Sequence, residues 1–210
     1  TFSMTSSRPE MRDLDALLSL SLPNAAFATV TNLQQSFTNL RSLREFPLLD
    51  LSSCTNFSET WNSCTSLKSF PACDVSSGTD FSDAWRSNYS LKDFPVIDVS
   101  SGTDFERCWA DCRSLTTFPA LNFSSATTFR VCWIRCYQLS SFPANVFDST
   151  GTLASNAFNQ AFRYCSLSAQ SIENILTSLD TNGATGIQLH INDGYNASYS
   201  TWSGALHRDW

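Results

Sequence analysis

The pair Phe-Pro recurs along this chain at a constant interval. Each step is 24 residues, and the copies stand at Phe46-Pro47, Phe70-Pro71, Phe94-Pro95, Phe118-Pro119 and Phe142-Pro143. A tryptophan keeps the same interval, at Trp61, Trp85, Trp109 and Trp133. A unit this short cannot bury its own apolar face, so its copies must stack and share one continuous core. The repeat therefore predicts a solenoid rather than a closed globular domain.

Each unit divides into three parts. The residues before proline are restricted to extended geometry, which favours a short strand at Leu-x-x-Phe. Next comes a turn such as Asp-Val-Ser-Ser-Gly-Thr-Asp, whose side chains bond to their own backbone. Then Phe81, Trp85, Asn88 and Leu91 follow at spacings of four, three and three, typical of one helical face. The predicted fold class is an α/β repeat solenoid with short parallel strands and short convex helices.

The two ends differ from the repeats, as the caps of a repeat array should. We predict an N-terminal cap over residues 1–29 with a helix over residues 10–22, an array over residues 30–167, and a C-terminal cap over residues 168–210. The C-terminal cap should contain a helix closed by Asn182-Gly183, a strand over residues 186–191 and a helix over residues 197–210. The start of the chain lacks both an initiator methionine and a signal-peptide pattern, so we expect a processed product or an excised fragment.

Charge and hydropathy exclude several classes of function. Charged residues make up 15% of the chain, against about 25% in an ordinary domain. The net charge of −6 makes nucleic acid and anionic membranes poor partners. Because no apolar run approaches the roughly 18 residues that span a bilayer, we expect no membrane insertion.

The eight cysteines allow three interpretations. Cys64, Cys112 and Cys136 share the slot three residues after the tryptophan, and Cys108 and Cys132 share the slot just before it. Facing thiols could bind zinc or form disulfides. Small or apolar residues fill the equivalent slots of other units, which favours buried core thiols. We therefore predict neither a metal nor any other cofactor.

A second set of polar residues forms a ladder with the same period. Its members are Asp50, Asp74, Asp98 and Asn122. Stacked carboxylates could hold calcium, but the same residues serve as Asx-turns when local N–H groups satisfy them, and we favour the turns. Four Asn-x-Ser sequons, at Asn56, Asn88, Asn122 and Asn196, would matter only in a glycosylating host.

Catalytic patterns are poor. The two histidines, His190 and His207, both lie in the C-terminal cap, and an active site would have to be built there with Asp193. The serine-rich repeats offer hydroxyls but no base placed beside one. The sequence therefore predicts a protein that is not an enzyme.

The repeats themselves point to a binding surface. Their turns are nearly constant, whereas the polar positions of the helical segments vary and are rich in Arg and Tyr, residues favoured in interfaces. The predicted binding residues are Arg86, Tyr89, Arg107, Asp111, Arg113, Arg130, Arg135 and Tyr137. Drift at solvated positions is the alternative, and the strand positions from Arg44-Glu45 to Ser140-Ser141 form a rival surface.

The residues from Ala110-Asp111-Cys112 to Ser114-Leu115-Thr116-Thr117-Phe118-Pro119 resemble the BspA-like leucine-rich repeats of bacterial surface and phage proteins. The resemblance covers about residues 30–167, and Asn88 departs from it by standing in a cysteine slot. It implies an extracellular, cell-surface or virion module, on a tail or fibre in phage, that recognises a protein or glycan receptor. The alternative is a structural subunit or spacer of a fibre, held together by self-association.

Overall fold

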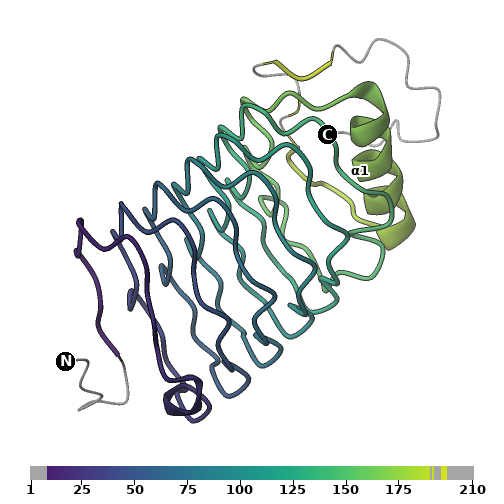
Figure 1. The fold of residues 1–210 in the computed structure, drawn as a ribbon. Helices are drawn as coiled ribbons and strands as arrows, with labels where there is room; N and C mark the ends of the chain where they lie inside the picture. The colour runs from purple at the N-terminus through teal and green to yellow at the C-terminus, as the bar shows by residue number, and fades with distance from the viewer. Residues whose placement is uncertain (1–8, 190, 192–194, 198–210) are drawn as a thin grey trace.

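The chain folds as a stack of flat coils that advance steadily from the N-terminal to the C-terminal end (Figure 1). The computed structural model describes residues 9–189, 191 and 195–197. Neighbouring coils are joined by isolated parallel bridges between residues 24 apart, such as Asn56 with Asp80 and Asp80 with Asp104. The solenoid and its 24-residue period, both predicted from the sequence, are therefore present.

The segments predicted as convex helices are not helical. The helices of the described residues are the 3-10 helix η1, Asn24–Ala26, and the α-helix α1, Ala169–Asn182, and both lie outside the repeats. In each repeat the backbone instead forms consecutive turns over residues 57–65 and their equivalents, which we call the turn segments. The prediction of short convex helices was wrong.

The hydrogen bonds of one turn segment show how it replaces a helix. The N–H groups of Phe57, Glu59, Trp61 and Ser63 donate to carbonyls of the next coil, at 2.8 to 2.9 Å. Those of Thr60 and Asn62 donate to the carbonyl three residues back, and that of Ser58 donates to the side-chain oxygen of Asn56. An α-helix would direct all of its N–H groups along its own axis and leave none for the neighbouring coil.

The short distance between coils explains why turn segments form here instead of α-helices. The rings of Trp61 and Trp85 stack with centroids 5.0 Å apart, and Trp85 and Trp109 stack at 5.6 Å. Two packed α-helices need about 8–10 Å between their axes. On the strand side Phe46 and Phe70 also stack at 5.6 Å, so both sides of the stack keep ladder spacing and leave no room for helices.

Each turn segment requires two residues in the left-handed region. Glu59 has φ 54° and Ser63 has φ 63°, and the same two positions have positive φ throughout the array, including Asp83, Arg107, Val131 and Arg135. Non-glycine residues adopt this region rarely, and a β-branched one such as Val131 is an outlier. The hydrogen bonds between coils therefore hold these residues in a backbone conformation that they would not adopt alone, and each coil bears the conformational free-energy cost of two such residues.

The strand side is less regular than predicted. Its bridges, such as Glu45 with Ser69 and Thr117 with Ser141, are isolated and do not extend into strands in the described residues. A proline stands two residues after each of these bridged residues, and it has no N–H with which to extend the bridge into a ladder. The core between the two sides contains the stacked tryptophans and phenylalanines, which are almost fully buried, together with the repeated leucines and the cysteines.

The N-terminal cap helix predicted over residues 10–22 does not form. The N–H groups of Met11 and Asp13 donate to the carbonyls of Ser36 and Thr38, and the Leu18 carbonyl accepts from Arg44 N–H. Residues 11–18 thus continue the ladder as a further coil, because the next coil presents backbone groups that a helix would leave unpaired.

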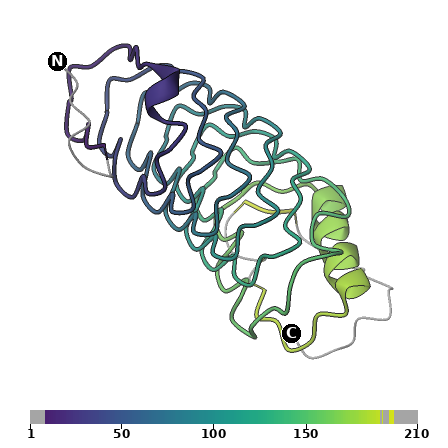
Figure 2. The same cartoon turned by 90° about the horizontal axis from the view of Figure 1, so that it is seen from below.

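The C-terminal end is closed by the predicted helix. α1 begins after Ser168, whose side chain accepts from Ser171 N–H, and ends at Gly183 with φ 77°. It lies along the last coils (Figure 2), where Ser171 and Ser178 Oγ accept from the N–H groups of Phe142 and Phe147. The helix thereby provides hydrogen-bond acceptors for backbone N–H groups of the last coil.

The remaining cap predictions have different outcomes. Residues 187–189 form no strand, while His190 and most of the helix predicted over residues 197–210 lie outside the described residues. Neither helix of the described part of the chain combines the length and the apolar character needed to cross a membrane.

Candidate functional site

The eight cysteines are buried and unbridged. Cys64 and Cys136 each donate a thiol hydrogen bond, at 3.2 Å, to a carbonyl of the preceding coil, that of Phe37 or Trp109. Burial raises the pKa of the Cys64 thiol to about 12, so the free thiol stays protonated at neutral pH. The interpretation as core thiols is confirmed by this burial, and among the described residues no cluster of metal-binding side chains occurs.

The aspartate ladder consists of Asx-turns, as we favoured. Asp50 Oδ1 accepts from Ser52 N–H at 3.1 Å, and Asp98 Oδ1 accepts from Ser100 N–H at 2.9 Å. The hydrogen bond from the Ser100 side chain lowers the pKa of Asp98. Each carboxylate is thus engaged with its own turn.

In two of the four sequons the asparagine side chain is buried or hydrogen-bonded within the fold. Asn88 is fully buried. The Asn196 side chain accepts from Leu167 N–H and donates to the carbonyls of Phe162 and Ile191. Neither amide is presented for glycosylation in this fold.

All eight predicted binding residues lie on the turn segments, and we call the outer side of these segments the turn face. They do not form one site. They divide into two ion-paired clusters and one hollow, and the clusters already use most of the arginines.

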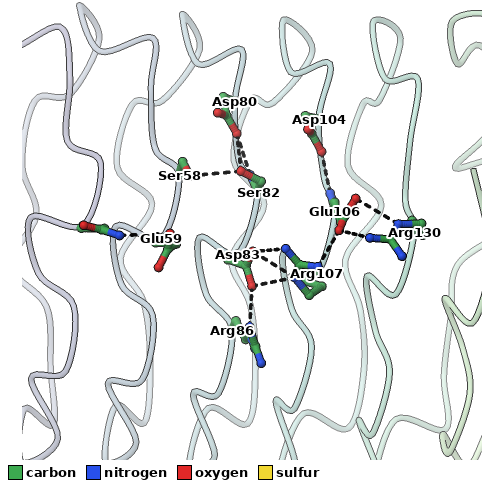
Figure 3. Close-up of polar contacts among 11 residues, drawn as sticks. Ser58, Glu59, Asp80, Ser82, Asp83, Arg86, Asp104, Glu106, Arg107 and Arg130 are labelled. Carbon is green, nitrogen blue, oxygen red and sulfur yellow. Dashed lines mark hydrogen bonds and ion pairs between the residues drawn. The ribbon is translucent and has the colours of Figure 1, made fainter.

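The first cluster joins three coils around two carboxylates (Figure 3). Asp83, whose side chain is 9% exposed, binds Arg86 and Arg107, each at 3.0 Å. Glu106 binds Arg107 at 2.6 Å and Arg130 at 3.0 Å. The hydrogen bond to Asp83 raises the pKa of Arg107. Arg107 and Arg130 therefore connect neighbouring coils, whereas Arg86 pairs with Asp83 within its own coil.

The second cluster centres on Asp111, which is buried. Arg113 donates to Asp111 Oδ1 at 3.0 Å and places its guanidinium 4.2 Å from the ring centroid of Tyr89. Arg135 approaches Asp111 Oδ2 only to 3.6 Å, and its side chain is 48% exposed. Arg135 is thus held more loosely by this carboxylate than Arg113 is.

A hollow of about 560 Å³ lies beside Arg135 and is lined by Arg135, Tyr137, Tyr164 and Tyr195. Its volume falls within the range of small-molecule sites, about 300–1,000 Å³. Tyr164 stands one coil beyond Arg135 and shares its left-handed backbone. Tyr195 is 74% exposed and is anchored by its N–H to the Cys165 carbonyl at 3.2 Å. An arginine and three phenols therefore converge where the array meets the cap.

Sequence reasoning missed Tyr164 and Tyr195. Residues inserted after Phe142-Pro143 break the period, so that Trp133 stacks on Phe162 rather than on a residue 24 positions later. Aligning Phe162 with the tryptophans would have placed Tyr164 in the slot of Arg135. No repeat signal pointed to Tyr195, and His190, Asp193 and His207 lie outside the described residues.

The turn face is electrically uneven. Between residues 106 and 164 the chain carries five arginines, and its acidic residues there are Glu106, Asp111 and Asp148. The whole chain has a net charge of −6. The arginines of this stretch outnumber its acidic residues by two, and this small positive excess on an acidic protein favours an anionic ligand of low charge.

No protein-family model matches the sequence, and no curated protein is significantly similar to it. A solved structure that is similar belongs to a leucine-rich repeat protein from Bacteroides ovatus, with 14% identity and a TM-score of 0.48. The similar region covers 83% of this chain and 42% of that protein, so this chain spans less than half of its length. A similarity this low establishes neither family nor function, and the BspA-like assignment stays a prediction.

Proposed function

We propose that this chain is a non-catalytic recognition module that binds its ligand in the hollow lined by Arg135, Tyr137, Tyr164 and Tyr195. The observation that carries the proposal is the gathering of an arginine and three tyrosines around one hollow, where Arg135 is held only loosely by Asp111. Arginine and tyrosine dominate the energetics of protein interfaces. Tyrosine also offers a rigid amphipathic surface at low entropic cost.

The rest of the turn face supports this hollow. Asp83 and Glu106 hold the neighbouring arginines, so these side chains are fixed before any ligand arrives. A stack of coils tied by a backbone ladder is a stiff scaffold, and a stiff scaffold reduces the ordering cost of binding. The polar, serine-rich surface fits the extracellular, cell-surface or virion location that we expect for such a module.

A glycan array probed with the fluorescently labelled full chain tests the proposal. We expect binding to a restricted set of glycans, lost in Arg135→Gln and kept in Arg86→Gln. Arg86 is the matched control because it is also an exposed arginine of the turn face, but it lies in the first cluster. An array without signal, or a signal that Arg135→Gln leaves unchanged, would contradict the proposal.

A structural subunit of a fibre is the second candidate, favoured by exposed leucines at the N-terminal end. Leu14 is 46% and Leu18 60% exposed on the first coil. Light scattering across a concentration series, with and without reductant, separates the two. A monomer throughout would favour the recognition module, whereas growth with concentration that Leu18→Lys abolishes would favour the assembly.

A further inference from the structure

We infer that the ligand of the hollow is a sugar ring that carries a single carboxylate, of the uronic or sialic acid type. This inference rests on the proposed function and specifies its ligand. It follows from the three aromatic walls, from the single cation in the lining and from the acidic charge of the whole chain.

The aromatic walls favour a sugar ring. Tyr137, Tyr164 and Tyr195 present phenol rings whose faces are electron-rich and whose hydroxyls both donate and accept. The C–H faces of a pyranose pack against such rings, and its hydroxyls can bond to the phenols. The guanidinium of Arg163 lies 4.8 Å from the Tyr164 ring centroid, which leaves the rings of Tyr137 and Tyr195 as the main stacking surfaces for the sugar.

The single cation favours one carboxylate over a phosphate. Arg135 is the charged residue of the lining, and its contact with Asp111 at 3.6 Å is longer than a normal hydrogen bond. A guanidinium has five N–H donors in a planar fork that fits a carboxylate in a bidentate manner. Asp111 is also held by Arg113 at 3.0 Å, so it would keep a cation when Arg135 turns to a ligand.

The surrounding charge disfavours a polyanion. Glu106 and Asp111 both lie on the turn segment of the preceding coil, and the chain carries a net charge of −6. A ligand with many negative charges, such as a nucleic acid or a sulfated polymer, would be repelled outside the hollow. An isolated carboxylate on a neutral, hydroxylated ring matches both the local cation and the acidic remainder.

Isothermal titration calorimetry with the full chain, supported by saturation-transfer NMR, tests the inference. The probes are methyl glucuronide and methyl N-acetylneuraminide as the acids, methyl glucoside as the matched neutral sugar, and a short acetylated peptide with a free C-terminus. We expect an acid to bind at least about tenfold more tightly than methyl glucoside, the effect of one charge-assisted hydrogen-bond pair. The peptide should bind no better than methyl glucoside.

The variants separate charge from stacking. Arg135→Gln, and Arg135→Asn as the variant better suited to positive φ, should reduce the acid to the affinity of the neutral sugar. Tyr137→Ala should weaken both sugars. Arg86→Gln should change neither, and circular dichroism and tryptophan fluorescence should show that each variant keeps the fold.

Two groups of results would overturn the inference. Equal affinity for acid and neutral sugars, or tighter binding of the peptide, would refute an acidic sugar while leaving recognition at the hollow intact. Weak binding of every probe together with a positive glycan array that depends on Arg135 would also refute only the ligand class. Binding that survives the replacement of both Arg135 and Tyr137 would refute the hollow and the proposed function together.

Discussion

Asn88 occupies a slot that the four coils with Cys64, Cys112, Cys136 and Cys165 fill with cysteine, and its replacement by cysteine should stabilise the protein. In the next coil the equivalent Cys112 donates its thiol hydrogen bond to the Trp85 carbonyl at 3.3 Å. Asn88 is fully buried, and neither its amide nitrogen nor its amide oxygen has a hydrogen-bond partner. The equivalent acceptor for a cysteine at position 88 is the Trp61 carbonyl.

The magnitude follows from the buried amide. A buried polar group without a partner costs about 1–3 kcal/mol. Cysteine is similar in size to asparagine and behaves as a small hydrophobic residue with a weak donor. We therefore expect Asn88→Cys to raise the free energy of unfolding by about 2 kcal/mol, or roughly 4–8 °C in the melting temperature for a chain of this length.

Urea unfolding followed by tryptophan fluorescence, under reducing conditions, would measure this change. The reciprocal variant Cys112→Asn is the matched control and should lose about the same amount, because it places an unpartnered amide in an equivalent slot. Asn88→Ala removes the amide but leaves a small void, so its stability should fall between wild type and Asn88→Cys. The reasoning would be refuted if Asn88→Cys were no more stable than wild type while Cys112→Asn were tolerated.

Three further predictions follow from other parts of the array. Asp104→Asn should stabilise by up to about 1 kcal/mol at neutral pH, because burial raises the pKa of this carboxyl and an amide keeps the bond from Glu106 N–H. This gain in stability should vanish as the pH falls below the unfolded pKa of about 4. Urea titrations that show an equal gain at neutral pH and below pH about 4 would contradict the prediction. Val131→Asn should stabilise by about 1 kcal/mol, since Val131 has φ 61° and asparagine tolerates that region better; thermal melts that show a loss would contradict the assigned backbone. Iodoacetamide near neutral pH should label none of the eight buried thiols in the folded chain and all of them after unfolding, as mass spectrometry would show; rapid labelling of the folded chain would be inconsistent with their burial.

The structure shows where the predicted binding residues lie, and their role in binding stays a prediction. All eight predicted residues lie on one face, but Arg107 and Arg130 are joined across coils to Asp83 and Glu106, and Arg86 is joined to Asp83 within its own coil. The sequence could not show this, because pairing between coils depends on which side chains the left-handed positions bring together. Of the predicted residues, Arg135 and Tyr137 line the hollow.

The sequence by itself determined which residues meet. A step of 24 residues between Phe-Pro pairs places each tryptophan against its copy, and the structure stacks Trp85 on Trp109 at 5.6 Å. The Asx-turns and the helix closed by Gly183 were also readable, because their signals are local and involve residues close in sequence.

Only the tertiary structure decided the backbone between those points. Spacings of four, three and three identify the residues that face the core, but they do not say where the N–H groups donate. Coils about 5 Å apart on both sides leave no room for helices. Alternate N–H groups of each turn segment therefore point toward the neighbouring coil and donate to its carbonyls. The hollow arises in the same way, since Tyr164 and Tyr195 reach Arg135 only through the stacking of the cap on the array.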